Sequence, residues 1–287
     1  MEHHHQQVPW QLKIAAKVVL SRVPLSHRLL NKVGVFNLGG MLRPEYAVGV
    51  FRRHFDHAEF ARKNEPFVVL EIGPGDSLFS VVIARAFGAS AGYGVDAGDF
   101  AAARIEHYQA LESYLRQKGL HPPSLARCSN FRDVMEICNG QYFTNSVESL
   151  KRIPTASVDF IFSHTVLQHV RRKEFRPMLA ELRRIQRPDG VGSHTISISD
   201  ILGGNLNDLR FSEKTWESDL MASSGFYTNR IRYNEFLRYF QEAGFIPEVY
   251  RTAHWDTLPT PRSKMAPEFA RLPEADLQIS GFDVYLH

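Results

Sequence analysis

A glycine-containing turn that follows an apolar segment is the feature of the sequence best suited to hold a ligand. Residues 68–72 are apolar except for Glu71, and Gly73, Pro74 and Gly75 follow them directly. Glycine lets a ligand approach the backbone closely, and in a doubly wound sheet the turn after the first strand lies where ligands bind. We therefore expect Glu71, Gly73, Pro74 and Gly75 to border a cofactor.

A carboxylate placed after the next apolar segment narrows the choice of cofactor. Asp96 follows Gly73 by 23 residues, a position from which a carboxylate accepts both hydroxyls of a ribose. Leu78 stands where dinucleotide-binding turns carry a third glycine. Negative charges at Glu71 and Asp76 would repel a pyrophosphate but suit a sulfonium and an ammonium group. S-adenosylmethionine is favoured, and an NAD-dependent oxidoreductase is the alternative.

The composition of the 287-residue chain is that of a folded globular protein. Hydrophobic residues make up 44% and charged residues 23% of the chain, which excludes wholesale disorder. The formal net charge is only +3, so nucleic-acid binding is not expected. Cys128 and Cys138 form no CxxC pair, so we expect no disulfide framework and no metal site. The sequence shows neither a run of about 18 apolar residues nor a signal peptide, which favours a cytoplasmic protein.

Short apolar runs alternate with longer helical segments from residue 66 onward, a pattern typical of βαβ units in a parallel sheet. His194 is expected to begin the fifth strand, at the end of the sheet opposite the glycine turn, and to be structural. The predicted strands are Phe67 to Ile72, Gly92 to Asp96, Gln141 to Thr144, Val158 to Ser163, His194 to Ser199, Phe245 to Arg251 and Leu277 to Leu286.

Four ordered motifs resemble those of the class I S-adenosylmethionine-dependent methyltransferases. They are residues 71–75, 94–96, 157–170 and 182–190. The resemblance implies an α/β, Rossmann-like fold with a mostly parallel seven-stranded sheet, an antiparallel last strand and helices on both faces. It also implies an enzyme that uses S-adenosylmethionine and releases S-adenosylhomocysteine. We expect an N-terminal helical extension over 1–63 and a methyltransferase domain over 64–287, with a cap or acceptor insertion at about 201–231.

By this resemblance, residues beyond the glycine turn are also expected to contact the cofactor. Asp96 would bind the ribose, and Ala97 would line the side of the adenine. Family members often have an acidic residue at the adenine edge, where Asn145 and Ser146 are the nearest candidates in this sequence.

The fourth and fifth predicted strands supply the candidates for catalysis. Ser163 and His164 end the fourth strand and are expected to open onto the cofactor cleft, while His169 follows where related enzymes often carry a histidine. A neutral histidine can take the proton of a hydroxyl acceptor, and Asp200, at the end of the fifth strand, can orient that acceptor. For His164, His169 and Asp200 a structural role is the alternative.

The segments 203–211 and 216–230 resemble a bacterial subgroup associated with cell-surface polysaccharide and sugar biosynthesis. This similarity implies a carbohydrate or another small hydroxylated acceptor, methylated at oxygen. Arginine suits carboxylates and phosphates, and aromatic rings suit sugar faces. The predicted acceptor-binding residues are Asn205, Asn207, Arg210, Trp216, Tyr227 and Arg230.

The N-terminal segment and the assembly leave further alternatives open. Apolar residues recur at helical spacing over 12–19, with Lys13 and Lys17 on another face. Such a helix can lie on an anionic membrane surface, although packing against the main domain is more common. A homodimer is compatible with the sequence. So is a non-catalytic protein that binds S-adenosylmethionine as a partner or regulator, which only turnover distinguishes from an enzyme.

Overall fold

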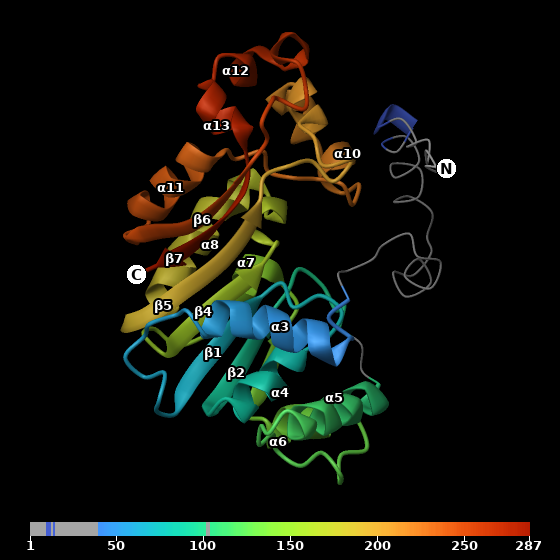
Figure 1. The fold of residues 1–287 in the computed structure, drawn as a ribbon, viewed down its shortest axis with the longest axis vertical. Helices are drawn as coiled ribbons and strands as arrows, with labels where there is room; N and C mark the ends of the chain where they lie inside the picture. The colour runs from blue at the N-terminus through green and yellow to red at the C-terminus, as the bar shows by residue number, and fades with distance from the viewer. Residues whose placement is uncertain (1–9, 13, 15–39, 102–103) are drawn as a thin grey trace.

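Within the described residues, seven strands form one sheet in the order β3-β2-β1-β4-β5-β7-β6. The structure is a computed structural model that describes residues 10–12, 14, 40–101 and 104–287 (Figure 1). β7 runs antiparallel to β5 and β6, and the remaining pairs are parallel, which confirms the predicted fold class. The strands are β1 (Phe67–Ile72), β2 (Ala89–Val95), β3 (Gly140–Phe143), β4 (Val158–His164), β5 (Gln186–Ser197), β6 (Pro247–His254) and β7 (Ile279–Leu286).

Helices pack on both faces of the sheet. The face covered by α3 (Pro44–Phe55), α4 (Phe79–Ala86), α5 (Ile105–Gln117) and α6 (Phe131–Ile137) is called the α3 face here. The opposite face, called the α8 face, is covered by α7 (Ser146–Leu150), α8 (Arg172–Ile185) and α11 (Tyr233–Glu242). Because the sheet separates two hydrophobic cores, successive residues of each strand alternate between them.

Aromatic side chains fix α3 across the middle of the sheet. Phe51 lies edge-on to Phe160 and Phe162 of β4, with ring centroids 6.2 and 5.8 Å apart, and Phe55 stacks on Phe67 of β1 at 5.2 Å. All are buried. α3 falls within the predicted extension 1–63, yet its apolar side shares the core of the sheet. The proposed boundary at residue 63 itself stays a prediction.

The segment predicted as a cap, about 201–231, contains only short helices among its described residues: η2 (Asn207–Arg210), α9 (Glu213–Trp216) and α10 (Asp219–Ala222). Its own small core surrounds the buried Trp216. Trp10, from the N-terminal segment, lies edge-on to Phe211 at 6.1 Å, and Ile14 packs on the same cluster. The rest of the predicted N-terminal amphipathic helix lies outside the described residues.

The fifth strand is longer than the sequence pattern predicts. β5 begins at Gln186 rather than at His194, and its first residues pair with Val158 across an irregularity in the ladder. Polar residues and Pro188 in this stretch hide the apolar pattern of a strand. His194 therefore lies inside β5 opposite Ser163 of β4, and the prediction that it begins the strand was wrong.

Four further short helices lie among the described residues. They are η1 (Leu167–His169), directly after β4, η3 (Arg262–Lys264), α12 (Pro267–Ala270) and α13 (Glu274–Gln278), which lie before β7. Because β1, β2, β4 and β5 are parallel, their carboxyl ends meet at one edge of the sheet. This edge collects the predicted site residues.

Candidate active site

A cavity of about 360 Å³, called the cofactor cavity here, lies at the carboxyl ends of β1 and β2. Four of the residues predicted to bind the cofactor line it: Gly73, Asp96, Ala97 and Ser146. Apolar side chains of α7 and α8 complete the wall on the α8 face. Its size lies in the range of small-molecule and cofactor sites.

The glycine turn is required by backbone geometry. Gly73 has a φ of +70°, and a Cβ added there would lie 2.5 Å from a methyl group of Val166. Gly75 also has a positive φ, of +65°, and its N–H donates to Asp96 Oδ2 at 3.0 Å. Glycine is the residue that adopts this conformation without strain. The turn is thus tied to the carboxylate at the end of β2.

Asp96 is positioned as a ribose-binding carboxylate would be. Its Oδ1 accepts from the N–H of Ala97 at 2.7 Å, and its Oδ2 accepts from Gly75. Each carboxylate oxygen has a second lone pair, so both can still accept hydroxyl groups. Partial burial raises the pKa of Asp96, against these two hydrogen bonds. The two acceptor oxygens of Asp96 and the close backbone at Gly73 fit a nucleoside cofactor.

Glu71 was predicted to present a negative charge to the cofactor, and its surroundings in the structure do not favour that charge. Its side chain is buried and accepts a hydrogen bond from Ser80 of α4. Burial raises its pKa to about 8, so the carboxyl group is largely protonated at neutral pH. Glu71 lies outside the lining of the cofactor cavity. A sulfonium therefore does not face a charged Glu71 in this arrangement, and that part of the argument was wrong.

Two other predicted cofactor residues, Ser163 and His164, lie outside the lining of this cavity. Ser163 is fully buried on the α8 face, where its Oγ lies 2.8 Å from Nδ1 of His194, whereas the next residue, His164, contacts α3. Neither lines the cofactor cavity. Pro74 is buried in the turn, and the exposed Asn145 precedes α7 without capping it. The structure thus does not place these four side chains in the cavity wall.

His169 is the predicted catalytic residue that lines the cofactor cavity. Its Nδ1 lies 2.9 Å from the carbonyl oxygen of Tyr227. A carbonyl only accepts, so Nδ1 carries the proton of this hydrogen bond and, in a neutral ring, Nε2 is the acceptor atom. Nε2 lies 3.4 Å from the side-chain nitrogen of Gln168. The cap segment thereby sets the tautomer of a histidine beside the cofactor.

Asp200 organises the loop after β5. It is 3% exposed, and its carboxylate accepts backbone N–H groups of Leu202, Gly203 and Asn207 at 2.7–2.9 Å, with a longer contact of 3.3 Å from Asn205. A carboxylate that accepts several backbone bonds holds a turn. Its contacts are those of the structural alternative to the catalytic prediction.

Most of the predicted acceptor-binding residues are buried within the cap. Trp216 is fully buried, and its Nε1 donates to the carbonyl of Thr228 at 2.7 Å. Arg230 donates to the carbonyl of Phe211 at 2.6 Å. Asn207, Tyr227 and Arg230 are each 5% exposed, and Asn205 and Arg210 are half-buried. The four buried residues pack inside the cap, none of the six lines the cofactor cavity, and their part in acceptor binding stays a prediction.

Comparison with protein families decides the class of the protein. Residues 70–193, from β1 into β5, match the family model described as a methyltransferase domain. The chain contains a methyltransferase domain. This match confirms the predicted enzyme class and the S-adenosylmethionine cofactor. The NAD-dependent alternative is not supported. No curated protein matches the sequence.

Solved structures resemble the methyltransferase at low sequence identity. YcgJ of Bacillus subtilis is 18% identical over 84% of this chain and 96% of its own, with a TM-score of 0.41. A putative O-methyltransferase of Nostoc punctiforme is 12% identical over 96% of this chain and 67% of its own, with a TM-score of 0.48. An S-adenosylmethionine-dependent methyltransferase of Archaeoglobus fulgidus is 11% identical over 85% of this chain and 94% of its own, with a TM-score of 0.44.

His54 of α3 is a residue of the methyltransferase that the sequence analysis missed. It is fully buried, its Nε2 lies 3.2 Å from Nδ1 of His164, and its Nδ1 lies 2.8 Å from Oγ of Ser193. The two histidines are 110 residues apart in sequence. Because α3 crosses β4 and β5 only in the folded chain, spacing gave no signal for this pair.

Burial keeps this histidine pair neutral. It lowers the pKa of His164 to about 4, and the nearby Arg53 lowers it further while Asp283 opposes the shift. The pKa of His54 is also lowered, mainly by burial and then by His164. At neutral pH both rings are uncharged, so the N–H of one ring donates a hydrogen bond to the ring nitrogen of the other and orients His164.

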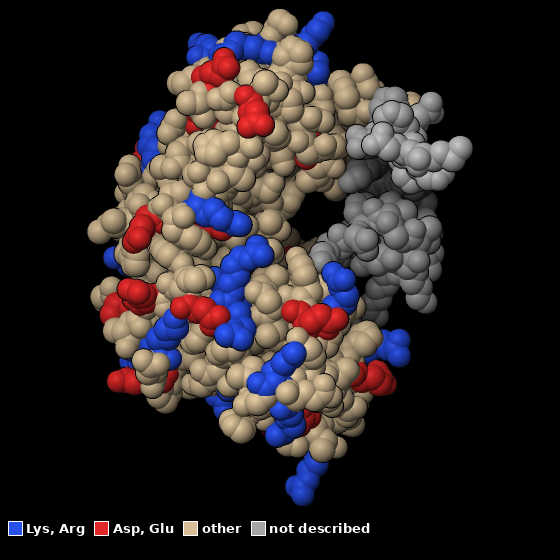
Figure 2. Space-filling view, in the orientation of Figure 1, with Lys and Arg blue, Asp and Glu red and all other residues tan. Residues whose placement is uncertain are grey.

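Three further properties hold for the described residues. None of their helices is both long and apolar enough to cross a bilayer. In the same part of the chain, no group of three or more His, Cys, Asp or Glu side chains is arranged to hold a metal ion. On the face shown in Figure 2, Lys and Arg side chains are interspersed with Asp and Glu.

Proposed function

We propose that this methyltransferase transfers a methyl group to a hydroxyl oxygen of a small-molecule or glycan acceptor, with His169 taking the hydroxyl proton. The observation that carries the proposal is the hydrogen bond from His169 Nδ1 to the Tyr227 carbonyl. It leaves Nε2 as the acceptor atom in a side chain that lines the cofactor cavity. Histidine is the side chain most often used for such proton transfer.

S-adenosylmethionine, when bound, supplies an electrophilic methyl group on a sulfonium. The protein has to orient the acceptor and remove its proton. Gly73 allows close approach of the backbone, and Asp96 would accept the ribose hydroxyls. His169 Nε2 would receive the proton as the oxygen bonds to carbon, while Tyr227 stabilises the imidazolium through Nδ1. Apolar residues of α7 and α8 would pack against the bound cofactor.

The test compares turnover with cofactor affinity in the variant His169→Gln. We expect turnover with a hydroxyl acceptor to fall about 10²–10⁴-fold, with cofactor affinity nearly unchanged. Acceptors are found by incubating the enzyme with methyl-labelled S-adenosylmethionine and fractionated metabolites, and the labelled carbon is assigned to oxygen by NMR. Methylation at nitrogen or carbon, or full activity of the variant, contradicts the proposal. Release of S-adenosylhomocysteine only when acceptor is present separates an enzyme from a cofactor-binding partner protein.

A carbohydrate acceptor is supported by the resemblance of segments 203–211 and 216–230 to enzymes of surface polysaccharide and sugar biosynthesis. We also propose that the protein is cytoplasmic and forms a homodimer. We further propose that its N-terminal helix contacts the membrane surface. Cell fractionation, analytical ultracentrifugation and sedimentation with anionic vesicles test these three points separately.

A further inference from the structure

A second cavity of about 380 Å³ lies where β5, β6 and β7 meet, and its lining residues come from these strands and the loops that follow them. Strand alternation places Thr195 and Asp283 on the α3 face, since Val191 and Tyr285 of the same strands belong to the core on that side. β6 is exposed along most of its length. The second cavity therefore opens beside α3, on the other side of the sheet from α8.

Two residues that line the second cavity each carry a buried side-chain oxygen without a hydrogen-bond partner among the described residues. The two oxygens are Oγ1 of Thr195 and Oδ1 of Asp283, in residues that are 9% and 2% exposed. Buried polar groups are normally hydrogen-bonded. Both atoms can accept a hydrogen bond, and the carboxylate can do nothing else. A ligand that supplies hydroxyl donors would satisfy them.

The charges of the second cavity favour a neutral ligand. Arg251 Nε donates to Asp283 Oδ2 at 2.5 Å, so the only cation in the lining is already paired with the only anion. A phosphate or carboxylate would meet the negative charge of Asp283 before it gained a free cation. An apolar ligand would leave Thr195 and Asp283 buried without partners.

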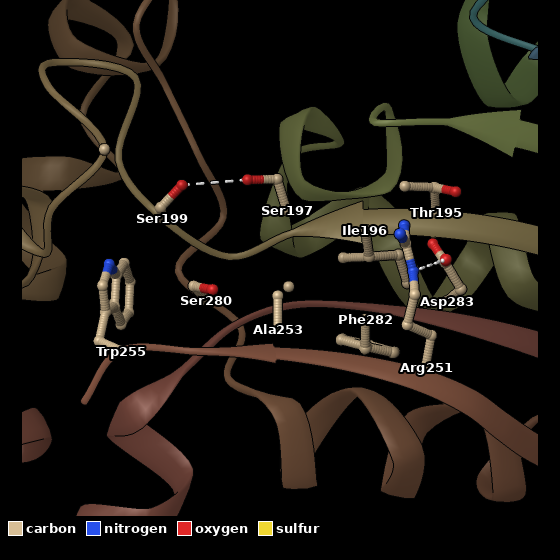
Figure 3. Close-up of a pocket in the computed structure, with 12 residues that line it drawn as sticks. Thr195, Ile196, Ser197, Ser199, Arg251, Ala253, Trp255, Ser280, Phe282 and Asp283 are labelled. Atoms are coloured by element: carbon tan, nitrogen blue, oxygen red, sulfur yellow. Dashed lines mark hydrogen bonds and ion pairs between the residues drawn. The ribbon is translucent and has the colours of Figure 1, made fainter.

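An aromatic ring lies at the end of the second cavity opposite Arg251 and Asp283. Figure 3 shows the indole of Trp255 at one end and Arg251 with Asp283 at the opposite end, with Ser280 and the hydrogen-bonded pair of Ser197 and Ser199 between them. Indole rings pack against the C–H face of sugars, while hydroxyl and carboxylate groups bind the sugar's rim. The lining thus combines an apolar plate with polar acceptors.

At the end of β4, two consecutive residues connect the linings of the two cavities. The N–H of Thr165 donates to the carbonyl of Thr195 at 2.8 Å, and the next residue, Val166, lines the cofactor cavity. Thr165 has a φ of +57°, which is strained for a β-branched residue and typical of functional sites. An acceptor that occupied both cavities would pass Thr165, which is exposed.

We infer that the second cavity is a subsite for a neutral polyhydroxylated part of the acceptor, such as an unmodified sugar ring, which hydrogen-bonds to Thr195 and Asp283 and packs on Trp255. This inference rests on the proposed transfer to a hydroxylated acceptor and locates the part of the acceptor that is not methylated. The inference thus assigns acceptor binding to residues of β5, β6 and β7 and not to the buried residues of the cap.

The test is saturation-transfer NMR of the full chain with S-adenosylhomocysteine and the methyl glycosides of glucose, mannose, galactose and rhamnose. We expect at least one glycoside to bind, and its affinity to fall about tenfold or more in Thr195→Val and in Asp283→Asn, because each change removes one hydrogen bond. Thr195→Val preserves shape and leaves the Arg251–Asp283 pair intact. Thr252→Val, on the same sheet and outside the cavity lining, is the matched control and should bind normally.

The outcomes separate this inference from the proposed function. Binding of no glycoside, equal binding by the wild type and both variants, or displacement of a bound glycoside by inorganic phosphate overturns the inference. If glycosides bind as expected but no hydroxyl acceptor is ever methylated, the proposed function fails and the subsite stands. If a hydroxyl acceptor is methylated and Thr195→Val leaves its KM unchanged, the function stands and the subsite fails.

Discussion

The cofactor cavity and the second cavity lie on opposite faces of the same sheet and are built in different ways. In the cofactor cavity, Gly73, Asp96 and Ala97 come from the first two strands and the turns after them. In the second cavity, Thr195, Arg251 and Asp283 meet only because β7 inserts between β5 and β6. The first cavity could be recognised from a local motif. The second could be found only from strand order and register.

Backbone strain gives the largest expected difference between the two cavities. Gly73→Ala places a Cβ 2.5 Å from Val166 at a positive φ, and we expect a loss of about 2–4 kcal/mol in the free energy of unfolding. Affinity for S-adenosylmethionine should fall about 100-fold, measured by calorimetry, while glycoside binding at the second cavity is retained by the folded protein.

Gly88→Ala is the matched control for that change. Gly88 also has a positive φ, of +97°, but an added Cβ would meet nothing within 4 Å. We expect it to cost about 1 kcal/mol of stability and to leave cofactor affinity unchanged. Equal effects of the two variants would show that the contact with Val166 is unimportant.

Glu71, next to the cofactor cavity, should make the protein less stable as the pH rises. Its folded pKa of about 8 lies above the ordinary value of 4.5, so the native state binds more protons between these values. The stabilisation is fully present below pH 4.5 and is lost as the pH rises through 8. Relative to wild type, Glu71→Gln should gain on the order of 3 kcal/mol between pH 5 and pH 9 in urea unfolding. The exposed Glu65→Gln should show no such trend.

His164, next to the second cavity, should have the opposite pH dependence. Its folded pKa of about 4 lies below the ordinary value of 6.5, so the unfolded chain binds more protons in that range. Stability is retained above pH 6.5 and falls as the pH drops toward 4, by about 2 kcal/mol. Besides His54, the charged groups that act on this ring are Arg53, Arg251 and Asp283.

The measurement for this histidine is urea unfolding between pH 4 and pH 7. His164→Gln should flatten the acid limb of the stability profile, whereas His254→Gln, at an exposed site on β6, should leave it unchanged. A wild-type profile without loss below pH 6.5 would contradict the neutral, buried His54–His164 pair.

Asp96 gives the smallest expected effect and tests the separation of the two cavities directly. Asp96→Asn keeps the shape of the side chain but removes its charge from the predicted ribose contacts, so we expect cofactor affinity to weaken by about 1.5 kcal/mol, or roughly tenfold. Thr195→Val, at the second cavity, should leave cofactor affinity unchanged in the same titration. A weaker cofactor affinity in both variants would mean that the cavities are not independent.

Much of the fold was predictable from the sequence because strands and turns have local signatures. β1 has the bounds that the apolar pattern predicted, Phe67–Ile72, whereas β5 was predicted eight residues too short at its start because Arg187 and Pro188 interrupt the pattern. The site was less predictable. Ser163 and His164 were expected to share a cleft, but neighbouring strand residues point to opposite faces.

By itself, the sequence determined the glycine turn, the carboxylate at the end of β2 and the order of βαβ units, since each depends on a backbone conformation or periodicity within a short segment. Tertiary structure decided that Glu71 is buried, that His54 contacts His164, and that Thr195 and Asp283 line one cavity. Burial and contact between distant residues arise from strand register and helix packing, which no local pattern encodes.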